Sequence, residues 1–295
     1  ALMIRASGAN FDGSMNIPNA KNAPIIGRFN KVYFKKSITV PVIAMAKTAP
    51  IQPTIKPTDF PALDISIEDL RISNLPLGRA ELLTIPTAQG MQISKLNTQS
   101  AFLSISTNGL WSGTGKQESV ALKAQLQSPD LGKLMSNMHY ENVINKGNAN
   151  LKFNINWPGG PMDFNMKSIT GFLDLEVTEG QLLSVDPGGG GRVLGLFSLA
   201  EIPRRLSLDF KDFFGKGFAF NKISGHFIFN QGSANTDNLI ISAPAATINV
   251  SGQTDYVKQE FNQRVEVHPK TGVILPVIGA LAAGPIGIVA GVVAQ

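Results

Sequence analysis

The stretch PGGGGRVLGL, residues 187–196, joins a glycine run to an apolar segment, a combination that holds phosphate in many nucleotide-binding proteins. A dinucleotide-binding fingerprint that starts at Gly188 needs a glycine at position 193, where this chain has Val193. A phosphate-binding loop that starts at Gly190 needs a lysine at position 196, where the chain has Leu196. The glycine run therefore predicts a flexible connector that leads into a helix, not a nucleotide site.

The other residues that could carry chemistry are too dispersed to form a recognisable site. His139, His226 and His268 lie far apart, with no partner four residues away that would complete a helical metal-binding pair. The chain has no cysteine and contains neither the G-x-S-x-G nor the H-E-x-x-H motif. Acidic pairs such as Asp174 and Glu176 occupy alternate polar positions, as solubilising side chains do. We therefore predict no enzymatic activity, no catalytic residues, no cofactor and no metal site.

Charge is unevenly distributed along the chain. Residues 1–60 contain eight Lys and Arg against two acidic residues, although the net charge of the whole chain is only +5. A basic segment could bind nucleic acid or anionic lipid headgroups. Because the basic side chains are scattered and no RNA-binding aromatic motif accompanies them, the pattern favours a solvated strand face. We predict no nucleic-acid partner.

The dominant pattern is the alternation of apolar and polar residues that is typical of half-buried strands. The segment LKFNINW places Leu151, Phe153 and Ile155 on one face, with Lys152 and Asn154 on the other. Equivalent alternation elsewhere puts these residues on the apolar face: Leu173, Leu175, Val177, Leu208, Phe210, Ile223, Phe227, Phe229, Leu239, Ile241, Ile248, Val250, Val265 and Val267. The sequence therefore predicts a mainly β protein.

Turn signals between these strands predict an antiparallel meander. Stretches rich in Gly, Asn or Pro lie at residues 157–161, 178–181, 230–233 and 251–255. Helix signals are few, and the clearest is the Ser-Pro start of residues 128–138. With so little helix to cover it, the sheet either closes on itself as a sandwich or barrel or keeps an open apolar face for a ligand. Pattern alone favours the closed sandwich.

Composition divides the chain into four segments. Residues 1–46 read as the end of a preceding β segment, and residues 47–61 as a connector with a proline about every four positions. Residues 62–271 form the main β segment. Residues 272–295 form an uncharged apolar tail, in which two prolines predict two short helices rather than one membrane span. The first residues do not have the pattern of a signal peptide.

The stretch PGGGGRVLGLFSLAEIPRRLSLDFKDFFGKGFAFNKISGHF, residues 187–227, resembles the C-terminal region of the AsmA-like YhdP family of Gram-negative bacteria. The family's R-x-L-G-L-x-S-L segment, its P-R-R-L motif and its D-F-x-D-x-F-x-x-G-F-x-F strand pair recur in the same order. The resemblance extends through residues 234–269 and covers the chain well from about Pro61 onwards. Since full-length members have an N-terminal membrane helix that does not appear in this sequence, the resemblance implies that the chain is a C-terminal fragment.

This resemblance implies an elongated, curled antiparallel sheet that forms an open hydrophobic groove with a few short helices. Similar proteins span the periplasm and are implicated in moving phospholipids between the inner and outer membranes. We therefore expect a lipid conduit of the cell envelope. The acyl chains of the transported phospholipids are expected to cover its apolar face. The full-length protein is expected to be anchored in the inner membrane by a part outside this fragment. The alternative is a non-transporting structural or assembly β-sandwich of the envelope.

The resemblance also assigns roles to individual residues. The apolar residues named above are expected to line the lipid groove. The helix predicted over residues 193–202 either packs as local core or gates one end of the groove. In the second case Arg192, Leu196 and Phe197 belong to the gating helix, and Arg204 and Arg205 lie close to headgroup phosphates. The expected partners are phospholipids and the two membranes.

Overall fold

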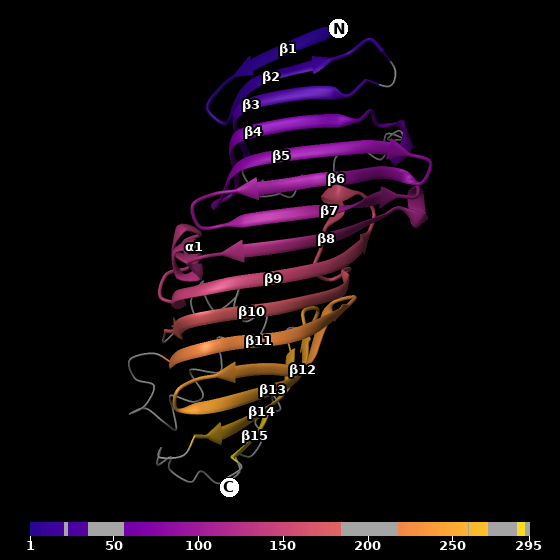
Figure 1. The fold of residues 1–295 in the computed structure, drawn as a ribbon. Coiled ribbons are helices and arrows are strands. Elements are labelled where there is room, and N and C mark those ends of the chain that lie inside the picture. The colour runs from indigo at the N-terminus through magenta and orange to yellow at the C-terminus, as the bar shows by residue number, and fades with distance from the viewer. Residues whose placement is uncertain (21–22, 35–55, 184–217, 259, 271–287, 293–295) are drawn as a thin grey trace, which may run out of the picture. The chain divides into compact units, whose positions relative to one another are not determined.

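A computed structural model of the chain describes residues 1–20, 23–34, 56–183, 218–258, 260–270 and 288–292 (Figure 1). These ranges contain fifteen β-strands, one α-helix and three short 3-10 helices, so the predicted mainly β class is confirmed. The chain forms two compact units. The first comprises Ala1–Ala101, Ser106–Val120 and Pro158–Met162, and the second comprises Phe102–Ile105, Ala121–Trp157 and Asp163–Gln295.

Strands of the first unit follow one another across the sheet in sequence order. They are β1 (Leu2–Ser7), β2 (Phe11–Ile17), β3 (Ile25–Phe34), β4 (Leu63–Ile72), β5 (Leu75–Thr87), β6 (Gly90–Gln99) and most of β7 (Ser104–Ser112). The pairs β1–β2, β2–β3, β4–β5 and β5–β6 are antiparallel, whereas β3 and β4 are parallel. Because β3 and β4 belong to one unit, the Pro-rich connector between them does not separate the two units. Its described part contains η1 (Pro57–Asp59).

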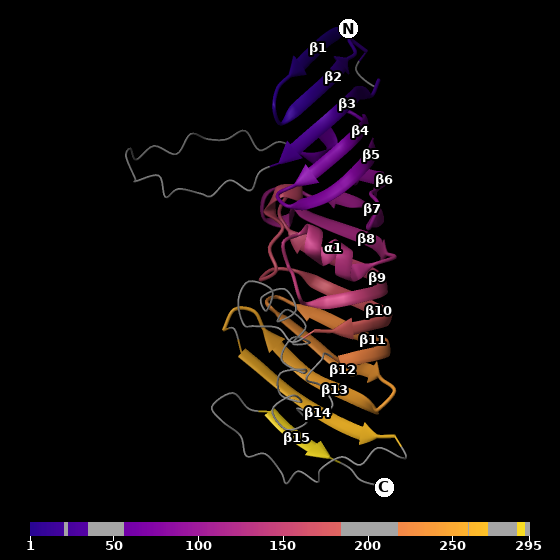
Figure 2. The same ribbon diagram turned by 90° about the vertical axis from the view of Figure 1, so that its left-hand side faces the viewer.

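The second unit has the same strand-after-strand order (Figures 1 and 2). Its strands are most of β8 (Ser119–Ser128), then β9 (Ile144–Pro158), β10 (Thr170–Leu182), β11 (Phe218–Asn230), β12 (Ser233–Ser242), β13 (Ala246–Asp255), β14 (Glu260–Pro269) and β15 (Ile288–Val292). Pairing from β9 to β14 is antiparallel, as predicted.

Strand β15 corrects the prediction of a helical tail. It pairs in parallel with β14, from Gln263↔Ile288 to Val267↔Val292. Its sequence, IVAGV, is rich in β-branched residues that favour strands. The rest of the predicted helical tail lies outside the described residues.

Alternation in the sequence explains the register of β10. Its side chains are alternately buried and exposed from Leu173 to Val177, because the polar residues between them face the opposite side of the sheet. Leu173 lies opposite Phe153 of β9 and Phe227 of β11, so apolar residues meet apolar residues across three strands. A shift by one residue would expose all of them, which fixes the register.

The predicted turns have mixed outcomes. The turn at 230–233 is confirmed, with positive φ angles at Gln231 (40°) and Gly232 (97°). At 157–161 strand β9 ends as predicted, but the connection to β10 is longer and contains η3 (Pro161–Asp163). The turns predicted at 178–181 and 251–255 are wrong, since β10 and β13 continue through these glycine-containing stretches.

Helix α1 (Leu131–Asn137) confirms the helix predicted at 128–138. The carboxylate of Asp130 accepts a hydrogen bond from the backbone N–H of Lys133 at 2.9 Å and caps the helix, while Leu134 and Met135 are buried beneath it. Across the described ranges, α1 included, no helix has the length and apolar character needed to cross a membrane.

Candidate functional site

The candidate site is an apolar surface made of in-register rows of side chains rather than a cleft with a few reactive groups. In the second unit one row runs across six strands, from Ala149 through Val177, Ile223, Ile241 and Ile248 to Val267. The next row contains Leu151 and Leu175, and the row after it contains Phe153, Leu173 and Phe227. We call this surface the apolar face of the second unit. It brings together the described members of the residue set predicted from alternation.

Burial varies along this face. Leu173, Ile241 and Ile248 are 0% exposed, whereas Leu151, Phe153 and Ile155 of β9 are half-buried. Part of the cover comes from α1, since a Cβ atom built on Gly147 would lie 3.2 Å from Val177 and 3.7 Å from Leu131 of that helix. Within this predicted set, β9 therefore carries more half-buried apolar side chains than the other described strands.

Leu208, Phe210 and the predicted gating and headgroup residues Arg192, Leu196, Phe197, Arg204 and Arg205 lie outside the described residues. For the remaining predicted residues, the structure gives their positions: these side chains lie on one face of the sheet, in register.

The first unit has an apolar face that the sequence reasoning missed. Gly27, Ile65, Leu82 and Leu96 lie opposite one another across β3 to β6. Ile65, Leu82 and Leu96 are all half-buried. The signal was present in the sequence, because apolar and polar residues alternate in LDISI at residues 63–67 as regularly as in the segments that predicted the apolar face of the second unit.

A polar cluster interrupts the apolar face of the second unit at the end of β13 and β14. Gln263 is 7% exposed, and its side-chain amide donates to the Thr254 hydroxyl at 3.3 Å. Burial raises the pKa of the nearby Tyr256 to about 12, so this phenol stays protonated at neutral pH. The alternation in FNQRVEVH pointed to Val265 and Val267 on this face but did not reveal the buried Gln263.

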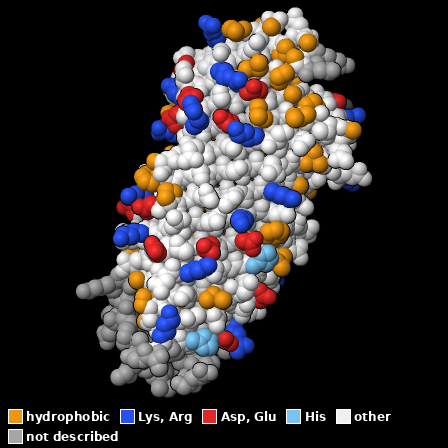
Figure 3. All heavy atoms as spheres, in the orientation of Figure 1, with side chains coloured by type: hydrophobic (Ala, Val, Ile, Leu, Met, Phe, Trp, Pro, Cys, Tyr) orange, Lys and Arg blue, Asp and Glu red, His pale blue; other side chains and the backbone are white. Residues whose placement is uncertain are grey.

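The opposite face carries paired charges. In the second unit His226 and Asp174, which are register partners, approach to 2.7 Å, and Lys222 pairs with Glu176 at 2.7 Å. The surface in Figure 3 shows basic and acidic side chains interspersed among uncharged atoms. Such exposed pairs contribute little stability, but they keep this face of the strands in water.

The first unit contains a polar cluster whose three side chains are joined by hydrogen bonds. Tyr33 donates to Asp69 at 2.5 Å, and Arg71 binds the same carboxylate at 3.0 Å. Burial alone would raise the pKa of Asp69, but the hydrogen bonds from Arg71 and Tyr33 together hold it below its ordinary value. This cluster is a structural tie between β3 and β4, because its groups satisfy one another.

Apolar contact is the main chemistry that the described surfaces offer. Within the described ranges no three His, Asp or Glu side chains come close enough to hold a metal ion. What the described residues do offer is half-buried apolar side chains on both units: Ile65, Leu82 and Leu96 in the first, and Leu151, Phe153 and Ile155 of β9 in the second. Such side chains can bind hydrocarbon without a fixed polar contact.

Comparisons with known proteins identify relatives of the chain. A model of the YhdP protein family matches residues 2–295. The protein "Intermembrane phospholipid transporter YhdP" of Escherichia coli (strain K12) is 21% identical over 287 residues, which make up 96% of this chain and 22% of that protein. No solved structure matches the chain. Since the family match extends over nearly every residue, the chain belongs to the YhdP family.

Proposed function

We propose that the chain is a segment of an intermembrane phospholipid transporter and that the apolar faces of its two units carry acyl chains. The similarity to a named phospholipid transporter supports the general activity. The observation that carries the acyl-chain part is the register, because it aligns apolar side chains across neighbouring strands instead of scattering them. Each CH₂ group that leaves water for such a surface contributes about 0.8 kcal/mol.

Transport along a sheet needs weak and repeated contacts. A row of similar aliphatic side chains gives an acyl chain nearly the same free energy at each strand, so no single position traps it. The half-buried residues Ile65, Leu82 and Leu96 of the first unit are accessible enough to make such contacts. In the second unit Leu151 and Phe153 of β9 are also half-buried and accessible enough for such contacts.

The proposed setting is the periplasm, where the full-length protein would be anchored in the inner membrane and would deliver phospholipids to the outer membrane. The predicted roles of the helix after the glycine run, and of Arg204 and Arg205 at lipid headgroups, belong to this proposal. A structural role as a closed sandwich is less well supported, because the strands within each unit follow one another in one sheet instead of forming two facing layers.

Two adjacent residues of β5 provide a matched test. Leu82 lies on the apolar face, whereas Leu83 faces the other side and is 39% exposed. The substitution Leu82→Gln places an amide against the bound hydrocarbon, and we expect about tenfold less copurified phospholipid. Leu83→Gln makes the same chemical change on the opposite face and should leave the lipid load unchanged.

The measurement is native mass spectrometry of protein purified from a detergent-free lysate. Circular dichroism and the melting temperature of both variants must match those of the wild type, so that unfolding does not imitate a binding defect. Wild-type protein without phospholipid, or equal loss from both variants, would contradict the proposal.

A further inference from the structure

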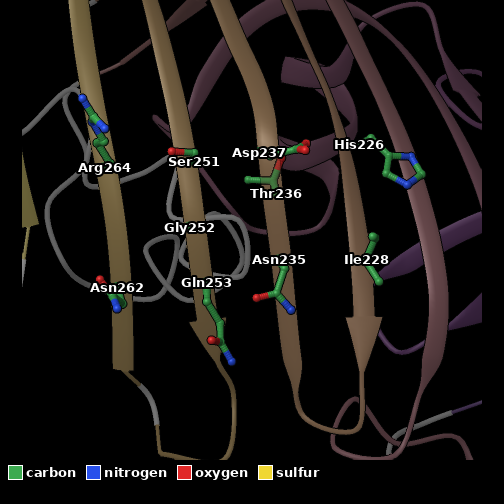
Figure 4. Close-up of a pocket in the computed structure, with 10 residues that line it drawn as sticks. All are labelled: His226, Ile228, Asn235, Thr236, Asp237, Ser251, Gly252, Gln253, Asn262 and Arg264. Atoms are coloured by element: carbon green, nitrogen blue, oxygen red, sulfur yellow. The ribbon is translucent and has the colours of Figure 1, made fainter.

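Three carboxamide side chains form a straight line on the polar face of the second unit. Asn235 of β12 lies opposite Gln253 of β13, which lies opposite Asn262 of β14. Figure 4 shows them side by side on three neighbouring strands, with Ile228 of β11 continuing the line. Since neighbouring strands are about 4.8 Å apart, the amides repeat at that spacing.

These amides line a hollow that lies next to two irregularities in the strand pairing. The hollow has a volume of about 500 Å³ and is also lined by His226, Ser251 and Arg264. Next to it, regular pairing of β11 with β12 breaks between Ser224 and Ile228, and that of β12 with β13 between Thr236 and Leu239. The side chain of Asn238 accepts a hydrogen bond from the backbone N–H of His226 at 2.9 Å. This bond satisfies a backbone donor at the interruption of the strand pairing.

The three amides are not committed to protein partners. Among the described residues, none of Asn235, Gln253 and Asn262 makes a side-chain hydrogen bond or ion pair. Each carboxamide offers two donor hydrogens and an acceptor oxygen. A ligand for this line must therefore present donors and acceptors together, at repeated positions.

The basic groups beside the line are already engaged, whereas Asp237, which also lines the hollow, makes no ion pair with the described residues. Arg264 pairs with Glu266 at 2.6 Å, and His226 pairs with Asp174 at 2.7 Å. An anionic polymer or an anionic membrane surface would need unpaired basic residues here, so the balance favours an uncharged ligand. Ile228, which is 53% exposed and lies opposite Phe172, adds apolar surface at one end of the line.

We propose that this amide line, Asn235–Gln253–Asn262, binds an extended uncharged glycan. Its hydroxyl and acetamido groups both donate and accept, as the carboxamides do, and the C–H faces of its sugar rings match Ile228 and Phe172. The site lies on the face opposite to the apolar rows, so it does not depend on the proposed lipid transport.

The probe is a linear hexamer of N-acetylglucosamine, added to the full chain labelled with ¹⁵N. We expect the side-chain NH₂ signals of Asn235, Gln253 and Asn262 to shift on titration. The triple variant N235A/Q253A/N262A should bind the hexamer at least about tenfold more weakly, because several neutral hydrogen bonds are lost. The control variant Q92A/N108A removes exposed amides from β6 and β7 and should bind as the wild type does.

Unchanged amide signals at saturating hexamer, or equal affinity of the triple variant and the wild type, would overturn the proposal. Binding of anionic vesicles at these three residues in place of the hexamer would also overturn it. The phospholipid load of the triple variant should equal that of the wild type, so failure of the glycan site and failure of lipid transport give different results.

Discussion

Single glycines allow these strands to continue where their sequences predict turns. Gly252 lies inside β13 with a φ of 133°, and a Cβ atom built on it would lie 2.2 Å from the carbonyl oxygen of Asn262 on β14. A backbone oxygen cannot move away without breaking the ladder, so this position accepts glycine alone. Gly171 of β10 is in the same situation against the carbonyl of Asn154, at 2.0 Å.

The substitution Gly252→Ala should lower the free energy of unfolding by more than about 1 kcal/mol, through the disfavoured φ and the backbone clash. Urea titration followed by circular dichroism measures the change. The control is Gly8→Ala, because a Cβ atom there meets nothing closer than 3.8 Å. A stable Gly252→Ala protein with an unchanged midpoint would show that β13 can move away from β14.

At the scale of the element, α1 shows how one side chain defines a helix end. Asp130 accepts the N–H of Lys133 at 2.9 Å, and its carboxylate also pairs with the Lys133 ammonium at 3.2 Å. The backbone hydrogen bond from Lys133 is the main cause that lowers the pKa of Asp130 below its ordinary value of 3.8. The folded state therefore favours the ionised carboxylate.

This pKa shift predicts a pH-dependent contribution to stability. A group whose pKa is lower in the folded state stabilises fully above its unfolded pKa, and the contribution is lost as the pH falls through the folded pKa. At pH 7 Asp130→Ala should cost about 1 kcal/mol of unfolding free energy. Asp130→Asn should cost less, because asparagine also caps helices, and its stability should depend less on pH in the acidic range. Equal pH profiles for Asp130→Asn and the wild type would contradict this assignment.

Alternation predicted the central strands well because it reports one-sided burial directly. The strands around Leu151, Leu173 and Ile223 were all found where the period of two placed them. The same reasoning failed at Gly252, since glycine signals a turn and a close backbone approach equally well. It also failed at Ile288–Val292, where apolar residues suit a helix or a strand and the partner strand decides.

The candidate site could be predicted only in part. Position on the apolar face follows from local alternation, so Phe227 and Ile248 were identified correctly as members of one surface. The degree of burial depends on what covers the sheet, which is a property of tertiary structure. The buried Gln263 was missed for a related reason, because its partner Thr254 is nine residues away on another strand.

At the scale of the whole molecule, each unit combines an apolar face with a polar one. The apolar face of the first unit is half-buried, whereas that of the second is largely closed from β10 to β13. Charged partners such as Arg79–Glu68 and Lys222–Glu176 keep the polar faces hydrated. The strands of each unit therefore separate apolar from polar side chains on their two sides.

The most direct test of the central claim uses a photoreactive benzoylphenylalanine, placed at one position at a time in cells that contain radiolabelled phospholipid. Leu82 and Phe153 represent the apolar faces of the two units, and their neighbours Leu83 and Asn154 represent the polar faces. Illumination should cross-link phospholipid to positions 82 and 153 and not to positions 83 and 154. Equal labelling at all four positions, or labelling at none of them, would contradict the account of acyl chains carried on the apolar faces.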